Sequence, residues 1–286
     1  MERWYVSAII KDTEQMNVKS VLKQIEFKAK KRLGQNFLHD EMVLDAILSH
    51  ADIHPRDTVL EIGAGLGILT EGLSETAGSV ISLEVDKVLY EYLETRFKNH
   101  KNVHILLQDI LKFNPDDLPD QNVKVIANLP YYISTPILTH LMKFIRKFSL
   151  ILIMLQEELA ERITAGPGSK KYGSLSILTR FYTQAEIVAH VPRTAFYPSP
   201  GVDSALVRLQ VLEQPCIDIS DPEGFFRIVR AAFSHRRKTL RNSLLGSGKI
   251  SAEKLDAAFR ATGISPTLRA ETLSIHEFAK LAQFLL

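Results

Sequence analysis

Thr58-Val59-Leu60-Glu61-Ile62-Gly63-Ala64-Gly65-Leu66-Gly67-Ile68 joins an apolar, β-branched-rich run to a turn that contains three glycines. The run predicts a buried strand, and the glycines permit positive φ angles and a close approach of the backbone to a ligand. A dinucleotide-binding fingerprint requires a glycine at position 68, where this chain has isoleucine. The stretch therefore predicts a strand, a ligand-facing turn and a helix, and it weakens the case for a nicotinamide dinucleotide.

Strand and helix patterns alternate on both sides of this turn. Apolar runs predict strands at residues 58–62, 79–83, 103–107, 123–127 and 150–155. Helical patterns lie at residues 66–76, 87–98 and 135–147. Such alternation predicts an α/β fold with a mainly parallel sheet covered by helices on both faces. Two further candidate strands, which would pair antiparallel at one edge and complete a seven-stranded sheet, lie at residues 186–190 and 205–212.

The pattern changes to helices alone after Pro215. Helical periodicity is found around residues 222–235, 239–245, 252–262 and 275–285. We therefore expect a domain boundary near residues 213–215 and a small all-helical C-terminal domain at residues 214–286.

The composition is that of an ordinary soluble globular protein. The chain has 286 residues, of which 45% are hydrophobic, enough for a sizeable core and about two domains. One cysteine, Cys216, excludes an internal disulfide, and the apolar stretch at residues 4–10 is too short to span a membrane. We expect a cytoplasmic protein without a signal peptide or a membrane span.

Basic residues concentrate toward the C-terminus. Residues 214–286 carry 11 Lys and Arg against 7 Asp and Glu, whereas residues 1–213 carry 24 against 26. Two basic clusters lie at residues 28–32 and 235–241. Each cluster alone is as consistent with a solvated helix face as with phosphate binding, so RNA binding gains support only if both clusters flank one cleft.

Four polar or small residues follow the first four predicted strands. Gly63, Glu84, Asp109 and Asn128 each stand at a carboxyl end, and the carboxyl ends of parallel strands share one rim. Glu84 comes 21 residues after Gly63, the spacing at which an acidic residue binds ribose hydroxyls. Asp109 is placed to accept a bond from an adenine amine. The alternatives for both acids are a charge at a helix N-terminus or a solvated loop residue.

Asn128-Leu129-Pro130-Tyr131 follows the fourth predicted strand. The asparagine offers an acceptor and a donor, the proline stiffens the turn, and the tyrosine supplies a flat aromatic face. These groups are what a site needs to hold a planar, amine-bearing ring. The alternative for Asn128 is a helix cap or an ordinary turn residue.

Together these motifs resemble the S-adenosylmethionine-dependent adenine-N6 methyltransferases, and within them the ribosomal RNA adenine dimethyltransferase family. The resemblance rests on residues 63–67, Glu84, Asp109 and residues 128–131, and three further stretches are similar to that family: 34–38, 196–205 and 236–242. It extends from about Lys30 to the C-terminus. It implies a Rossmann-like methyltransferase domain at residues 30–213, a helical RNA-binding domain at 214–286, and an N-terminal extension of unassigned role at 1–29.

The resemblance implies S-adenosyl-L-methionine as cofactor, no metal, and methyl transfer to the amine of a flipped adenine. The implied catalytic residues are Asn128, Leu129, Pro130, Tyr131 and Phe196. The implied cofactor contacts are Asn36, Leu38, Gly63, Glu84, Asp109 and Asn128. The candidate RNA contacts are Lys30, Lys31, Arg32, Arg236, Arg237, Lys238 and Arg241. Tyr131 and Phe196 are the expected walls around the base, and the alternative for Phe196 is a loop aromatic that fills the core.

The substrate expected from the resemblance is small-subunit (16S) ribosomal RNA. Leu129 in the motif and the stretch at residues 236–240 resemble the subgroup that dimethylates two adjacent adenosines in the 3′-terminal hairpin of this RNA. The expected partner is therefore the immature small ribosomal subunit, and a monomer is expected because no sustained heptad pattern is present. The alternatives are a large-subunit rRNA adenine methyltransferase that confers antibiotic resistance, a noncatalytic ribosome-assembly factor, and a nucleotide-dependent oxidoreductase.

Overall fold

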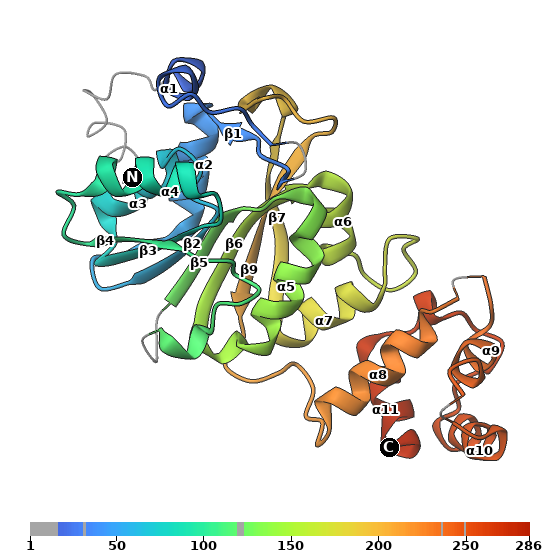
Figure 1. The fold of residues 1–286 in the computed structure, drawn as a ribbon. Helices are drawn as coiled ribbons and strands as arrows, with labels where there is room; N and C mark the ends of the chain where they lie inside the picture. Colours follow the sequence, from blue (N-terminus) through green and yellow to red (C-terminus); the bar gives the residue numbers. More distant parts are fainter. Residues whose placement is uncertain (1–16, 31–32, 119–122, 236, 249) are drawn as a thin grey trace, which may run out of the picture.

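The structure is a computed structural model that describes residues 17–30, 33–118, 123–235, 237–248 and 250–286. A seven-stranded sheet forms the centre of the described chain (Figure 1). Its strands run in the order β4 (Val103–Leu107), β3 (Ser79–Glu84), β2 (Thr58–Ile62), β5 (Val123–Asn128), β6 (Phe148–Gln156), β9 (Ser204–Val211) and β7 (Thr183–Val191). The first five strands are mutually parallel, and β9 pairs antiparallel with both β6 and β7. The predicted mainly parallel sheet with antiparallel pairing at one edge is confirmed.

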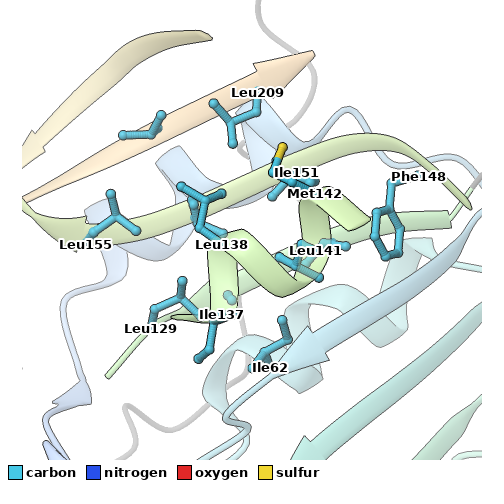
Figure 2. Close-up of a cluster of buried hydrophobic side chains, with 14 of the residues drawn as sticks. Ile62, Leu129, Ile137, Leu138, Leu141, Met142, Phe148, Ile151, Leu155 and Leu209 are labelled. Carbon is cyan, nitrogen blue, oxygen red and sulfur yellow. The ribbon is translucent and has the colours of Figure 1, made fainter. Parts of the chain in front are cut away.

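Helices cover both faces of this sheet. One face is covered by α2 (Glu41–Ala51), α3 (Ile68–Thr76) and α4 (Lys87–Phe97), and the other by α5 (Ser134–Lys143), α6 (Glu157–Thr164) and α7 (Ser174–Tyr182). Ile137, Leu138 and Leu141 of α5 point toward apolar side chains of the strands (Figure 2). The apolar positions three and four residues apart explain why α5 buries this side.

Three of these helices were not expected from the sequence. α2, α6 and α7 were missed, and the predicted helix at residues 135–147 ends at Lys143, before a 3-10 turn at Ile145–Lys147. The sequence of α7, Ser-Leu-Ser-Ile-Leu-Thr-Arg-Phe-Tyr, has few strong helix formers. Burial of Ile177 and Phe181, which are 0% and 1% exposed, stabilises the helix instead.

The residues after β9 form helices, as predicted. They are α8 (Pro222–Ala232), α9 (Leu240–Leu245), α10 (Ala252–Thr262) and α11 (Ile275–Leu285), and they lie beside α7 at one end of the molecule (Figure 1). Their apolar core includes side chains of α7, and the rings of Phe181 and Phe225 stack with centroids 5.6 Å apart. The helical region is thus packed against the sheet domain through α7, and the domain boundary near residue 214 stays a prediction.

The described part of the N-terminal segment packs onto the glycine turn. α1 (Val18–Gln24) and Phe27 form an apolar cluster with Phe37, Leu66 and Leu89. β1 (Phe37–Leu38) then pairs antiparallel with β8 (Phe196–Tyr197), outside the main sheet. Residues 17–29, to which the sequence assigned no role, therefore help to hold the segment that leads to β1. No helix within the described ranges is long and apolar enough to cross a membrane.

Candidate active site

A cavity of about 290 Å³ opens at the carboxyl ends of β2, β3 and β5. Several predicted site residues line it together: Asn36, Gly63, Glu84, Asp109, Asn128, Leu129, Pro130 and Tyr131. Apolar side chains, among them Ile62, Leu83 and Ile137, line it as well. The prediction that the residues after the parallel strands share one rim is confirmed.

The glycine turn brings backbone against this cavity. Gly63 and Gly65 have φ angles of +79° and +59°, which a residue with a Cβ atom rarely adopts. The nearest protein atom to a Cβ built on Gly63 is the Asn128 carbonyl oxygen at 3.8 Å, whereas one on Gly65 meets the Phe37 ring at 3.3 Å. The positive φ angles therefore favour glycine at both positions, and at Gly65 the Phe37 ring also leaves little room for a side chain.

Glu84 is buried at the end of β3 and binds three backbone amides. Its Oε2 accepts from Gly65 at 2.9 Å, and its Oε1 accepts from Val85 at 2.8 Å and from Asp86 at 2.9 Å. Burial raises the pKa of Glu84, although the three N–H groups act in the opposite direction. The carboxylate is thus fixed at the cavity wall beside the glycine turn, with further lone pairs for ligand hydroxyls.

Glu61 lies beneath the turn, inside the sheet. Its Oε2 accepts hydrogen bonds from Thr70 Oγ1 at 2.6 Å and Ser82 Oγ at 2.5 Å. Burial raises the pKa of Glu61 to about 7, and the charge of Glu84 acts in the same direction. Glu61 thus links β2 to α3 and β3, and it is not part of the described lining of the cavity.

Asn128, at the end of β5, and Asp109, in the loop after β4, both line the cavity. The Asn128 amide nitrogen donates to the Asn36 carbonyl at 3.3 Å, and the Asn36 amide nitrogen donates to the Gly34 carbonyl at 3.0 Å. Asp109 accepts from the Leu111 backbone N–H at 2.9 Å. The bond to the N-terminal segment uses one of the two N–H groups of Asn128 and orients the amide, whose oxygen is an acceptor suited to a ligand amine.

The loop after β5 is held by backbone contacts. Leu129 N–H donates to the Met154 carbonyl at 3.1 Å. The Pro130 carbonyl accepts from Ile133 N–H at 3.2 Å and from Ser134 Oγ at 2.9 Å. Both lone pairs of the Pro130 carbonyl are thereby used, so the Leu129 carbonyl is the better backbone acceptor for a substrate.

Tyr131 is anchored through its hydroxyl group. The hydroxyl lies 2.6 Å from Ser204 Oγ, and Ser204 is 0% exposed at the start of β9. Burial raises the pKa of the Tyr131 phenol, and the charge of Asp203 acts in the same direction, against the hydrogen bond from Ser204. A neutral, anchored phenol is not a proton acceptor at neutral pH, so the ring face is the part of Tyr131 suited to a substrate.

Two predicted site residues are buried and lie outside the described lining of the cavity. Phe196 is 2% exposed and packs in the same cluster as Val43 and Ile47, so its role as a wall around the base stays a prediction. Leu38 is 7% exposed, packs in that cluster and is not part of the described lining of the cavity, so its role as a cofactor contact stays a prediction. The β1–β8 pairing places Leu38 opposite Phe196, so the two residues are buried together.

Two of the predicted RNA contacts are engaged within the protein. Lys30 pairs with Asp86, and Arg241 forms a two-point contact with Asp256 at 2.7 and 3.0 Å, so the structure does not present either as a free cation. The side chains of Arg237 and Lys238 are exposed. The predicted contacts Lys31, Arg32 and Arg236 lie outside the described residues.

The sequence did not predict several residues of the cavity wall, three of which offer a polar group or an aromatic ring to a ligand. Gln35, Phe37 and Tyr132 line the cavity, and Tyr132 is 55% exposed. Gln35 and Phe37 flank the predicted contact Asn36, which is the signal that would have found them. Tyr132 directly follows Tyr131, and no pattern in the sequence separates an exposed aromatic from a buried one there. Among the described residues, no cluster of three or more His, Cys, Asp or Glu side chains is arranged to hold a metal ion.

Comparison with known proteins relates this site to one family. The family model described as ribosomal RNA adenine dimethylase matches residues 26–286. The ribosomal RNA small subunit methyltransferase A of Streptococcus thermophilus (strain CNRZ 1066) is 43% identical, with 93% of this chain and 95% of that protein covered. The protein of the same name from Clostridium botulinum (strain Okra / Type B1) is 44% identical, with 93% and 98% covered.

Solved structures agree with these relatives. A dimethyladenosine transferase from Plasmodium falciparum has a TM-score of 0.75 and 27% identity, covering 86% of this chain and 95% of its own. The 23S rRNA methyltransferase ErmE has a TM-score of 0.69 and 26% identity, covering 87% and 99%. The family model spans nearly the whole described chain, and residues 128–131 lie at the cavity. The protein therefore belongs to the ribosomal RNA adenine dimethylase family.

Proposed function

We propose that this enzyme dimethylates N6 of two adjacent adenosines in the 3′-terminal hairpin of small-subunit ribosomal RNA, with S-adenosyl-L-methionine as methyl donor. The observation that carries the reaction is the position of residues 128–131 on the same cavity as Glu84 and Asp109. The small-subunit assignment is supported by the name of the relatives that are 43–44% identical over nearly their full length.

The residues of the cavity fit the cofactor. A buried carboxylate at Glu84 suits ribose hydroxyls, Asp109 suits an adenine amine, and the turn at Gly63 leaves backbone uncovered at the wall. Asn36 and Gln35 supply polar groups from the N-terminal segment. The cavity is close to the lower limit of small-molecule sites, about 300 Å³. When bound there, S-adenosylmethionine supplies an electrophilic methyl group.

The amine of adenine is a poor nucleophile because its lone pair is delocalised into the ring. Two acceptors for the amine protons would localise that lone pair on nitrogen and orient it. The side-chain oxygen of Asn128 and the Leu129 carbonyl are suited to this task, since both are acceptors and the Pro130 carbonyl already has two partners. No strong general base is required, because the alkylated amine loses its proton readily.

Aromatic side chains would bind the flipped adenine base on the substrate side of the cavity. A paired or stacked base must leave the RNA helix to reach a cavity of this kind. The Tyr131 ring, anchored at Ser204, offers a face that stabilises the developing positive charge on the amine. Tyr132, exposed on the cavity wall, is a further aromatic candidate beside the predicted Phe196.

Contacts to the remainder of the RNA would come from the basic surface. Arg237 and Lys238 are exposed between α8 and α9, and RNA phosphates bind such cations with release of counterions. The expected partner is the immature small subunit, which presents the hairpin before assembly is complete.

Transfer of tritiated methyl groups tests the proposal. Small subunits and large subunits that lack these methyl groups are incubated separately with the enzyme, and the modified nucleotides are mapped by primer extension. We expect label in small subunits alone, at two adjacent adenosines, and none with the Asn128→Ala variant. Label in large-subunit RNA would support the antibiotic-resistance alternative, and the fold likeness to ErmE makes that comparison necessary. No label in either subunit would support a noncatalytic assembly factor.

A further inference from the structure

Lys30 stands beside the cofactor cavity, yet its charge is neutralised by a buried acid. Its ammonium lies 2.5 Å from Asp86 Oδ2, and the Asp86 side chain is 1% exposed, against 41% for Lys30. The same ammonium lies 5.6 Å from the centroid of the Phe27 ring. A buried carboxylate without a partner is costly, so this pairing is strongly favoured once the chain folds.

Asp86 belongs to the same turn as Glu84. Its backbone N–H donates to Glu84 Oε1 at 2.9 Å, and its own Oδ1 accepts from Val88 N–H at 3.1 Å, which caps α4. Burial would raise the pKa of Asp86, but the hydrogen bonds from Lys30 and Val88, together with the charge of Lys30, hold it below its usual value. Asp86 is therefore an ionised anchor two residues from the carboxylate suited to ribose.

Lys30 also begins the segment that forms one wall of the cavity. Its backbone N–H donates to Gln35 Oε1 at 2.8 Å, and residues 33–37 line the cavity. The segment then reaches Asn128 through the Asn36 carbonyl. A single segment thus connects the turn of Glu84 on the cofactor side with the loop of Asn128 on the substrate side.

We propose that Lys30 is a positioning residue of the cofactor site: its ion pair with Asp86 fixes residues 33–37 as a wall of the cavity and thereby raises the affinity for S-adenosylmethionine. The alternative is the RNA contact that the basic cluster suggested. The inference depends on the cofactor and the cavity, and not on which ribosomal RNA is the substrate. Its test can therefore fail independently of the small-subunit assignment.

Calorimetry with S-adenosylhomocysteine in the absence of RNA measures the cofactor side alone. Lys30→Ala should weaken binding about tenfold, the loss expected for one charge-assisted hydrogen bond that orders the site. Lys30→Arg should stay within about threefold, because a guanidinium also reaches a carboxylate. Lys23→Ala, which removes an exposed lysine of α1, is the charge-matched control and should leave the Kd unchanged. Unchanged affinity in Lys30→Ala would overturn the proposal.

A double-mutant cycle identifies Asp86 as the partner. Asp86→Asn keeps a side chain that can cap α4 but removes the ion pair. We expect Asp86→Asn to weaken binding, and Lys30→Ala to have no further effect in that background. Full additivity of the two substitutions would contradict action through Asp86. Thermal melting of each variant separates a local effect from loss of the fold.

Kinetics and RNA binding separate positioning from an RNA contact. Lys30→Ala should raise KM for the cofactor about tenfold while kcat changes less than about twofold, as expected when an interaction common to ground state and transition state is lost. The slope of log K against log salt for RNA binding to the cofactor-free protein should not change. A phosphate contact would instead reduce that slope by about 0.7 to 0.9, and such a reduction with an unchanged cofactor Kd would establish the RNA role.

Discussion

Removing the Tyr131 hydroxyl while keeping its ring tests which part of this residue serves the reaction. Tyr131→Phe deletes the 2.6 Å contact to Ser204, whose side chain is fully buried. Loss of one such hydrogen bond, with a buried hydroxyl left unpaired, should reduce the free energy of unfolding by about 1 to 3 kcal/mol. If the ring face stabilises the developing charge, kcat should fall by no more than about threefold, since the ring itself remains.

Tyr131→Ala removes the ring as well. A cation–π contact in a desolvated site contributes about 2 kcal/mol, which corresponds to a fall in kcat of about 30-fold. Loss of base stacking, about 1 to 3 kcal/mol per base, should also raise KM for RNA. Ser204→Ala is the matched control, because it breaks the same hydrogen bond from β9 and leaves the tyrosine intact. Its kcat should resemble that of Tyr131→Phe.

Initial rates of tritiated methyl transfer to undermethylated small subunits give kcat and KM for each variant. Calorimetry with S-adenosylhomocysteine should give affinities within about threefold of one another, because the ring face is assigned to the base and not to the cofactor. The reasoning is refuted if Tyr131→Phe loses as much kcat as Tyr131→Ala. That result would assign the role to the hydroxyl group.

Four further substitutions test other parts of the site. Asn128→Ala should lower kcat at least about 100-fold, because one group that orients the transition state is lost. Calorimetry should show that the affinity for the cofactor is nearly intact. Near-normal turnover would exclude the proposed role of Asn128. Glu84→Gln should weaken cofactor binding about 10- to 100-fold because charged acceptors of hydrogen bonds contribute about 1.5 to 3 kcal/mol, and an unchanged calorimetric Kd would argue against a ribose contact. Phe196→Ala should destabilise the fold by about 3 to 5 kcal/mol in urea denaturation, whereas a stable variant without turnover would support its place at the base. Burial raises the pKa of Glu61 from 4.5 to about 7, so the folded state binds a proton at this carboxyl more tightly than the unfolded state. The contribution to the free energy of unfolding is complete below about pH 4.5 and is lost as the pH rises through 7. Glu61→Gln should therefore flatten the fall in unfolding free energy between about pH 5 and 8, up to about 3 kcal/mol, and an unchanged pH slope would contradict the burial argument.

Helix caps and hydrophobic periodicity predicted helices well where both were present in the sequence. The predicted bounds of α10 and α11 agree with the structure, because Ser251 and Ser274 cap their N-termini and Gly263 ends α10 in a left-handed conformation. α7 was missed because its composition disfavours helix, and packing against both the sheet and the helical region stabilises it. β1 and β8 contain two residues each, too few for any periodic pattern.

The site was predictable to the extent that strand order determines it. Parallel strands end on one rim, so Gly63, Glu84 and Asn128 could be placed together from the sequence. The contacts that were missed concern side chains whose partners lie far away in the chain. Phe196 is buried in the same apolar cluster as residues of α2, and Lys30 pairs with the buried carboxylate of Asp86. No local sequence pattern predicts either of these contacts.

The pairing of β1 with β8 determines when the enzyme first becomes competent as it is synthesised. Residues 37–38 leave the ribosome long before residues 196–197, since translation proceeds at about 5 to 20 residues per second and domains fold from the N-terminus. A nascent chain that ends before β8 carries the glycine turn and Glu84 but lacks the partner of β1 and the Ser204 anchor of Tyr131. We therefore expect ribosome-bound chains to complete the place for the base only after β8 and β9 have emerged.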